Sequence, residues 1–284
     1  MSTLTATRDT AALAHAICAD AQAAGALLLC TDYDGTLSPI APTPESANPL
    51  ATAVSALTWL SRSGAERGEG ARVPVRVATI TSRACAHLVD RLQLGPEAII
   101  VGSAGLERWS RGHIDIDPEV VEWLPAIDEA AGRLATALAE GRAPGARLER
   151  KQCGVAIHTR GLHSAEAERD ALLLAREVGE VTGLRVQPAK HALELRPPLD
   201  RDKGTALLDL RGGALARAAV CAAGDDFADI PMLEAAIAQP HSTAVAVVDV
   251  ETPAAVIDVA SAAVDGPWGW AEVLQSLVEE LRRS

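Results

Sequence analysis

Two carboxylates follow a hydrophobic run near the start of the chain. In the segment ALLLCTDYDGT, Asp32 and Asp34 come directly after the apolar run that begins at Ala26, and Gly35 and Thr36 follow at once. Side chains two residues apart on a strand point to the same face, so these two anions would repel each other without a cation nearby. Carboxylate oxygens are ligands that Mg²⁺ prefers in proteins. The pair therefore predicts a magnesium site.

Three further polar clusters have chemistry that complements this pair. Thr81, Ser82 and Arg83 follow a second apolar run, and Asp225 and Asp229 follow a third in the segment GDDFAD. Lys203, in the segment DRDKGTAL, begins a predicted helix before that third run. Because ligands gather at the carboxyl ends of parallel strands, we expect these clusters to meet at one edge of a sheet.

The combined residue types suit phosphoryl transfer. A carboxylate can attack phosphorus, so Asp32 is the predicted nucleophile of an aspartyl-phosphate intermediate. Asp34 would protonate the leaving alcohol and later take a proton from water. Thr81 would offer its hydroxyl and a backbone N–H at a helix N-terminus to the phosphate oxygens. Lys203 would add a fixed positive charge for the same group.

The pattern of apolar runs predicts the fold class that this site requires. Short apolar strands alternate with amphipathic helices, which indicates an α/β fold with a parallel sheet covered on both faces. We expect an N-terminal helix at residues 10–24. The other expected elements of the core are strands at 26–31, 73–80, 98–101, 218–223 and 244–248, and helices at 49–61, 83–92, 203–210 and 230–238.

The middle of the chain has a different pattern. A helix at 118–139 is followed by two adjacent strand-like runs, a helix at 165–181 and two more strand-like runs. Adjacent strands joined by local turns predict an antiparallel sheet with helices on one side. We therefore expect a core domain formed by residues 1–106 and 198–284, with an α+β domain inserted at 107–197.

Composition excludes several function classes. A formal charge of −12 argues against nucleic-acid binding, because phosphate backbones attract basic surfaces. No window approaches the roughly 18 apolar residues of a membrane helix, which argues against a membrane partner. The N-terminus lacks the pattern of a secretion signal. The five cysteines, Cys18, Cys30, Cys85, Cys153 and Cys221, are scattered and odd in number, which suits a cytoplasmic location.

The polar clusters together resemble the motifs of haloacid-dehalogenase-type (HAD) phosphatases. These motifs are Asp-x-Asp-Gly-Thr-Leu, a Ser or Thr after the second strand, a Lys, and Gly-Asp-Asp-x-x-Asp, in that order. The resemblance implies a Rossmann-like HAD core with a type-2 cap inserted between Thr81 and Lys203. It also implies a Mg²⁺ cofactor and two overlapping residue sets. The metal set would be Asp32, Asp34, Asp225 and Asp229, and the phosphate set Asp32, Gly35, Thr81, Ser82 and Lys203.

Further segments resemble the trehalose-6-phosphate phosphatase family of that superfamily. They are DYDGTLSPI, VGSAGLER, LERKQCGVAIHTR, HALELRP, DKGTAL and GDDFAD. The resemblance implies hydrolysis of a disaccharide 6-phosphate, in the first place trehalose 6-phosphate, and a sugar-phosphate synthase as a candidate partner. It also implies substrate-binding residues, which would be Arg83 at the substrate end of the core and Glu149, Lys151, His158, Arg160 and Glu194 on the cap.

Some positions depart from the family pattern and leave alternatives open. Ala104 stands where the family has His, Thr159 replaces Tyr, and Ile230 replaces Glu. None of these departures removes a residue of the phosphoryl chemistry, and several lie where sugar recognition or cap docking would occur. One alternative is therefore a phosphatase for a related or pseudo-disaccharide phosphate in secondary metabolism. Another is a catalytically idle sensor of sugar phosphates.

Structural explanations also compete for single residues. Asp225 and Asp226 could cap a helix, and Thr81 could cap the helix that follows it. Asp229 could orient a metal-bound water instead of binding the ion. His158 and Arg160 could be the solvated face of an amphipathic strand, and the same alternative holds for Glu149, Lys151 and Glu194.

Overall fold

The computed structural model of the chain describes residues 9–63, 73–95, 97–160, 162, 164–189 and 192–283. The chain divides into two compact units. Unit 1 combines Met1–Ile114 with Arg201–Ser284, and unit 2 is Asp115–Asp200.

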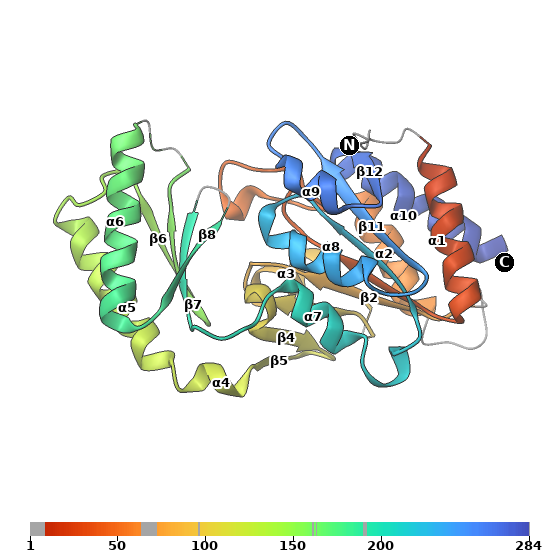
Figure 1. Cartoon of the computed structure of the whole chain (residues 1–284), viewed down its shortest axis with the longest axis horizontal. Helices are drawn as coiled ribbons and strands as arrows, with labels where there is room; N and C mark the ends of the chain where they lie inside the picture. Colours follow the sequence, from red (N-terminus) through yellow and green to blue (C-terminus); the bar gives the residue numbers. More distant parts are fainter. Residues whose placement is uncertain are drawn as a thin grey trace. The chain divides into compact units, whose positions relative to one another are not determined.

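A large, mostly parallel sheet forms the centre of unit 1 (Figure 1). In the described residues it has eight strands in the order β12-β11-β10-β1-β2-β3-β4-β5. The six strands from β12 to β3 are parallel to their neighbours, and β4 is antiparallel to β3. This confirms the predicted α/β fold. The strands are β1 (Leu27–Thr31), β2 (Val75–Ile80), β3 (Ile99–Gly102), β4 (Glu107–Ser110), β5 (His113–Ile116), β10 (Ala219–Gly224), β11 (Ser242–Val248) and β12 (Ala262–Asp265).

Helices cover both faces of this sheet, as continuous apolar strands require. Every residue of β1 is buried, and its side chains alternate between two hydrophobic clusters. Leu27 and Leu29 join the cluster with α1, α2, α3 and α10, whereas Leu28 and Cys30 join the cluster with α7, α8 and α9. These helices are α1 (Thr10–Ala24), α2 (Ala51–Ser63), α3 (Ala86–Leu92), α7 (Lys203–Leu210), α8 (Ile230–Ile237), α9 (Ala254–Val259) and α10 (Gly266–Arg283). Short 3₁₀ turns complete the unit as η1 (Pro44–Ser46), η2 (Ser103–Gly105), η3 (Gly213–Leu215) and η4 (Phe227–Asp229).

Local sequence signals set the ends of two helices. The α1 helix begins after Asp9, whose side chain accepts the Ala12 N–H at 2.8 Å, and it ends at Gly25 in the left-handed region with φ 78°. The α7 helix begins with a capping box formed by Asp202 and Thr205. That cap places Lys203 in the first turn, as the sequence predicts.

Unit 2 is an antiparallel sheet with helices packed on one face. The strand order is β6-β7-β9-β8, and all three pairings are antiparallel. Helices α5 and α6 lie side by side and pack on this sheet (Figure 1). The elements are α4 (Pro118–Val121), α5 (Leu124–Ala139), β6 (Arg147–Lys151), β7 (Gly154–His158), α6 (Ala165–Thr182), β8 (Arg185–Ala189) and β9 (Ala192–Arg196).

Some elements differ from the expectation. The helix expected at residues 118–139 is two helices, α4 and α5. Pro125 lies in the first turn of α5, where its missing N–H is tolerated, whereas inside one continuous helix it would remove a hydrogen bond. Helix α3 begins at Ala86 rather than at residue 83, and β12 was not expected. Strands β4 and β5 continue the large sheet. The domain division at 106/107 and 197/198 stays a prediction. Strand β4, which follows the first of these boundaries, is hydrogen-bonded to β3 of unit 1.

All five cysteines are free and buried. Among the described residues, no helix combines the length and the apolar character that crossing a membrane requires.

Candidate active site

The end of β1 holds Asp32 in a defined position. The Asp32 N–H donates to the Ala223 carbonyl of β10 at 2.9 Å. Behind it, Trp270 Nε1 donates to Thr31 Oγ1 at 3.1 Å, and that hydroxyl donates to the Asp32 carbonyl at 3.0 Å. Asp32 is only 4% exposed. The backbone of the predicted nucleophile is therefore fixed by β10 and α10.

Lys203 joins two of the predicted carboxylates. Its ammonium donates to Asp32 Oδ1 and to Asp229 Oδ1, each at 2.6 Å. Carboxylate oxygens of Asp32, Asp225 and Asp229 lie within 4.8 Å of one another, and all three residues are buried. Three buried carboxyl groups thus lie close together, and the Lys203 ammonium pairs with two of them, Asp32 and Asp229.

The loop after β10 fixes the other two carboxylates. Asp229 Oδ2 accepts the N–H groups of Asp225 and Asp226, both at 3.0 Å. Asp225 Oδ1 accepts the Thr36 hydroxyl at 3.2 Å. Asp229 thus orders the loop and Lys203 at once. The alternative in which Asp229 orients a metal-bound water instead of binding the ion stays a prediction.

The electrostatics of the cluster disfavour its negative charge. Burial raises the pKa of Asp32 well above its usual value, and the Asp229 carboxylate raises it further, while Lys203 opposes the change. Burial alone would lower the pKa of Lys203, but the Asp229 and Asp32 carboxylates outweigh it and raise that pKa. An additional positive charge in the cluster would therefore stabilise Asp32 as an anion.

The residues present fit a hard divalent cation. Carboxylate oxygens gathered in one buried cluster are ligands of the type that Mg²⁺ prefers in proteins. Gly35 is part of this fit, because a Cβ at Gly35 would lie 2.1 Å from Asp225 Oδ2. The absence of that side chain leaves the room that Asp225 occupies. Asp32, Asp225 and Asp229 are the residues that would hold the ion.

Asp34 lies outside this acidic cluster and has a different partner. Arg83 Nε donates to Asp34 Oδ2 at 2.6 Å, and Arg83 Nη2 donates to Asp34 Oδ1 at 2.7 Å. The guanidinium also lies over the Tyr33 ring, 5.2 Å from its centroid. Of the predicted metal set, the structure thus groups Asp32, Asp225 and Asp229, and it pairs Asp34 with the predicted substrate residue Arg83.

The predicted phosphate-binding backbone groups have other partners. The Thr81 N–H donates to the Val101 carbonyl at 2.9 Å, and the Gly35 N–H donates to the Ser38 carbonyl at 2.7 Å. Because α3 begins only at Ala86, the expectation that the Thr81 N–H lies at a helix N-terminus is wrong. The Thr81 hydroxyl accepts the Arg83 N–H at 3.1 Å. Ser82 lies between them in the same loop.

Comparison with known proteins identifies the family. A family model described as trehalose-phosphatase matches residues 30–255, which is most of the chain. The chain belongs to the trehalose-phosphatase family. Among curated relatives, the trehalose-phosphate phosphatases of Mycobacterium avium and Mycobacterium marinum are 35% and 34% identical over 177 residues. These matches cover 62% of this chain and 41% and 42% of the relatives, so the chain spans about two fifths of their length.

Solved structures similar to this chain agree with the family fold. The C-terminal domain of a C. albicans trehalose-6-phosphate phosphatase has a TM-score of 0.73 at 18% identity, over 97% of this chain and 98% of that one. A trehalose-6-phosphate phosphatase related protein has a TM-score of 0.71 at 24% identity, over 89% and 97%. A haloacid dehalogenase-like hydrolase from Bacteroides thetaiotaomicron has a TM-score of 0.57 at 16% identity, over 88% and 98%. At these identities the likeness shows the fold, which is HAD-like.

In unit 2, four of the residues that the family resemblance assigns to substrate form two close polar pairs on one face of the sheet. His158 Nε2 and Glu149 Oε2 lie 2.6 Å apart, and Lys151 pairs with Glu194. The register places Glu149 and Glu194 on either side of Ala156. Alternate residues on these strands face α5 and α6, which leaves the charged face on the other side of the sheet. Arg160 follows the end of β7 and is partly buried.

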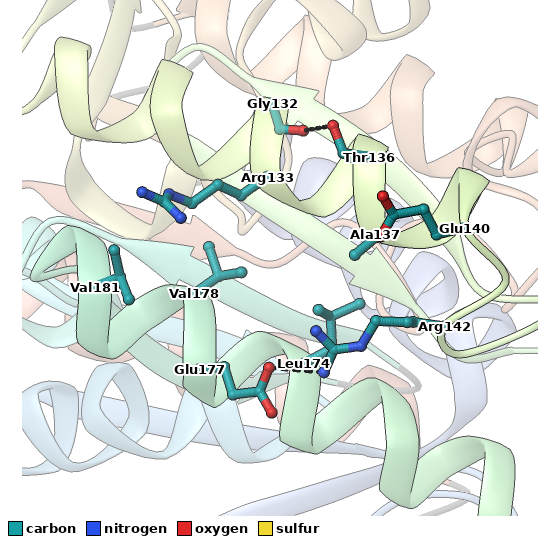
Figure 2. Close-up of a pocket in the computed structure, with 10 residues that line it drawn as sticks. All are labelled: Gly132, Arg133, Thr136, Ala137, Glu140, Arg142, Leu174, Glu177, Val178 and Val181. Carbon is teal, nitrogen blue, oxygen red and sulfur yellow. Dashed lines mark hydrogen bonds and ion pairs between the residues drawn. The ribbon is translucent and has the colours of Figure 1, made fainter.

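A separate groove lies between α5 and α6 on the helical side of unit 2 (Figure 2). It has a volume of about 470 Å³, and Arg142 and Glu177 form a 2.6 Å ion pair across it. Its lining comes from the two helices and the turn after α5 rather than from the sheet strands. The lining residues are Gly132, Arg133, Thr136, Ala137, Glu140, Arg142, Leu174, Glu177, Val178 and Val181.

Two supporting residues are not among those predicted from sequence. Thr36 contacts Asp225, and its place in the Asp-x-Asp-Gly-Thr motif is a signal that could have indicated it. Trp270 is fully buried and reaches Thr31 across 239 positions of sequence. Nothing local in the sequence indicates that second contact.

Proposed function

We propose that this protein hydrolyses a phosphate monoester at the acidic cluster of unit 1. The proposed substrate is a disaccharide 6-phosphate, with trehalose 6-phosphate as the first candidate. The observation that carries the proposal is the buried group of Asp32, Asp225 and Asp229 with Lys203 between two of them. Family membership supports the substrate class, since the curated relatives are named as trehalose-phosphate phosphatases.

In the proposed reaction, Asp32 attacks phosphorus. A bond forms between an Asp32 carboxylate oxygen and phosphorus as the bond from phosphorus to the sugar oxygen breaks. Asp34 gives a proton to that leaving oxygen, so the sugar departs as an alcohol. Water then attacks phosphorus and loses a proton to Asp34. The bond to Asp32 breaks, which releases inorganic phosphate and restores both carboxyl groups.

Lys203 and the cation balance charge in this scheme. The ammonium lies 2.6 Å from the Asp32 oxygen, so it offsets charge at the attacking group and on the phosphoryl oxygens. A divalent ion held by Asp32, Asp225 and Asp229 would add positive charge beside that of Lys203 when a phosphoryl dianion binds. The hydroxyls of Thr81 and Ser82 are the proposed side-chain donors to the phosphate.

The charged face of the unit 2 sheet is the proposed site of sugar recognition. Glu149, Lys151, His158 and Glu194 present both donors and acceptors from neighbouring strands, as sugar hydroxyls require. Arg160 would extend this set at the end of β7. In the protein without substrate, His158 contacts Glu149 and Lys151 pairs with Glu194, and sugar hydroxyls would take over some of those contacts.

A panel of phosphate esters tests the proposal. Phosphate release is measured with trehalose 6-phosphate, other disaccharide and monosaccharide phosphates, and p-nitrophenyl phosphate, with Mg²⁺ and with EDTA. We expect Mg²⁺-dependent release, with the highest kcat/KM for trehalose 6-phosphate. Preference for another sugar phosphate would support the related-substrate alternative, which the departures at Ala104, Thr159 and Ile230 favour. Absence of release from every ester would support the sensor alternative.

A further inference from the structure

The Arg83 side chain forms a two-pronged contact with Asp34. Two N–H groups of the guanidinium donate to the two different oxygens of the Asp34 carboxylate, at 2.6 and 2.7 Å. This fork geometry fixes both the place and the plane of a carboxylate. The Arg83 side chain is only 12% exposed, whereas that of Asp34 is 34% exposed. Arg83 thus lies behind a carboxylate that is open on its other side.

The backbone of Arg83 is itself held on two sides. Its N–H donates to Thr81 Oγ1 at 3.1 Å, and its carbonyl accepts the Ser103 N–H at 2.8 Å. The next amide of the same turn, from Ala104, donates to the Thr81 carbonyl at 2.9 Å. A Cβ at Gly102 would lie 2.8 Å from the Arg83 carbonyl oxygen, so only glycine permits this approach.

The turn that supports Arg83 has an unusual backbone. Ser103 and Ala104 are consecutive non-glycine residues in the left-handed region, with φ 48° and 49°. Such residues cost of order 1–3 kcal/mol each and persist only where their surroundings hold them. Here the Ser103 hydroxyl donates to Glu107 Oε1 at 2.6 Å, and Glu107 is 2% exposed. The turn is therefore a rigid support that costs free energy.

We infer that Arg83 is a positioning residue that orients Asp34 for proton transfer to the leaving oxygen. The inference rests on the proposed function and assigns Arg83 a different role from the substrate contact that the family resemblance implies. In this structure the guanidinium donates Nε and Nη2 to Asp34, which suits orientation of that carboxylate.

Leaving-group dependence separates these roles. The value of kcat/KM reports the step in which the bond from phosphorus to the leaving oxygen breaks, because that step comes first. A phenol that leaves readily needs no proton, whereas a poorly leaving phenol or an alkyl alcohol does. Loss of a positioned acid therefore lowers kcat/KM more as the leaving group becomes less acidic. Loss of a substrate or phosphate contact lowers it equally across a series of aryl phosphates.

The experiment measures kcat/KM for p-nitrophenyl phosphate, less activated aryl phosphates and an alkyl phosphate without a sugar ring. The variants are Arg83→Met, Arg83→Lys and Arg83→Gln, with Asp34→Asn as reference and the exposed β4 residue Arg108→Met as control. Circular dichroism shows which variants fold, and Arg83→Gln keeps N–H donors if Arg83→Met does not fold.

We expect Arg83→Met to steepen the dependence on leaving-group acidity toward that of Asp34→Asn. A loss of about 100-fold is expected for the alkyl phosphate, as for a misplaced catalytic group, with little change for p-nitrophenyl phosphate. Arg83→Lys should lie in between, and Arg108→Met should match the wild type. If plots of log kcat/KM against the pKa of the leaving group have the same slope for Arg83→Met and for the wild type, the inference is overturned. Absence of phosphate release by the wild type would instead refute the proposed function.

Discussion

Gly35→Ala is the substitution whose effect the structure predicts in most detail. A Cβ at Gly35 would lie 2.1 Å from Asp225 Oδ2 and 2.3 Å from its Cγ, although real Cβ contacts are essentially never under 3.0 Å. Asp225 would have to move by at least about 0.9 Å, the difference between 3.0 and 2.1 Å. Asp225 is fully buried, so it cannot move without displacing other groups. A misplacement of about 1 Å can cost on the order of 100-fold in activity.

A matched control separates this effect from backbone strain. Gly25 has the same φ, +78°, but a Cβ there would meet nothing within 4 Å. An alanine in the left-handed region costs about 1–2 kcal/mol, which both variants share. Gly25→Ala should therefore lower the free energy of unfolding by that amount and keep wild-type activity. Gly35→Ala should lower it further.

Three measurements check the comparison. Urea unfolding gives the free energies, phosphate release gives the activity, and the change in melting temperature on adding Mg²⁺ reports the cation site. We expect Gly35→Ala to lose about 100-fold in kcat/KM and most of the Mg²⁺ response. If Gly35→Ala matches Gly25→Ala in stability, activity and Mg²⁺ response, the assignment of Asp225 to the cation site is refuted.

Other substitutions test the charges of the site. Lys203→Met removes the ammonium that pairs with the buried Asp32 and Asp229 carboxylates, so in EDTA it should lower the free energy of unfolding by about 3–5 kcal/mol in urea titrations. Mg²⁺ should restore part of that loss, and a stability independent of Mg²⁺ would count against the site. Asp32→Asn should raise the melting temperature in EDTA, since a raised pKa means that the folded state disfavours the carboxylate at neutral pH. A lower melting temperature would contradict this reasoning. Glu194→Gln, which weakens the pair with Lys151, should raise KM for a sugar phosphate and leave p-nitrophenyl phosphate hydrolysis unchanged. An equal effect on both substrates would argue against sugar recognition by that pair.

Much of the fold follows from local patterns in the sequence. The strand that precedes Asp32 is apolar throughout, and the predicted bounds of α1 and α7 match because caps at Asp9 and Asp202 fix where each helix begins. The sequence prediction of one helix at residues 118–139 did not take account of Pro125, which lies in the first turn of α5 and marks the break. The short strand β12 was missed because four residues carry too little periodicity.

The candidate site was predictable as a set of residues but not as a set of contacts. The predicted parallel sheet indicates that Asp32 and Asp225 lie near each other, because the carboxyl ends of parallel strands share one edge, whereas Lys203 lies at the start of α7. The division of partners depends on side-chain geometry over long sequence distances. For example, Asp34 pairs with Arg83 and does not join the acidic cluster. The spacing of Asp32 and Asp34 in the sequence does not show this difference in partners.

The most direct test of the central claim is phosphate release by the wild type and by Asp32→Asn, side by side, with trehalose 6-phosphate and Mg²⁺. Asp32 provides the attacking oxygen in this account, so we expect release by the wild type and none by the variant. Circular dichroism should show the same fold for both proteins. Equal release by the two proteins would contradict the account.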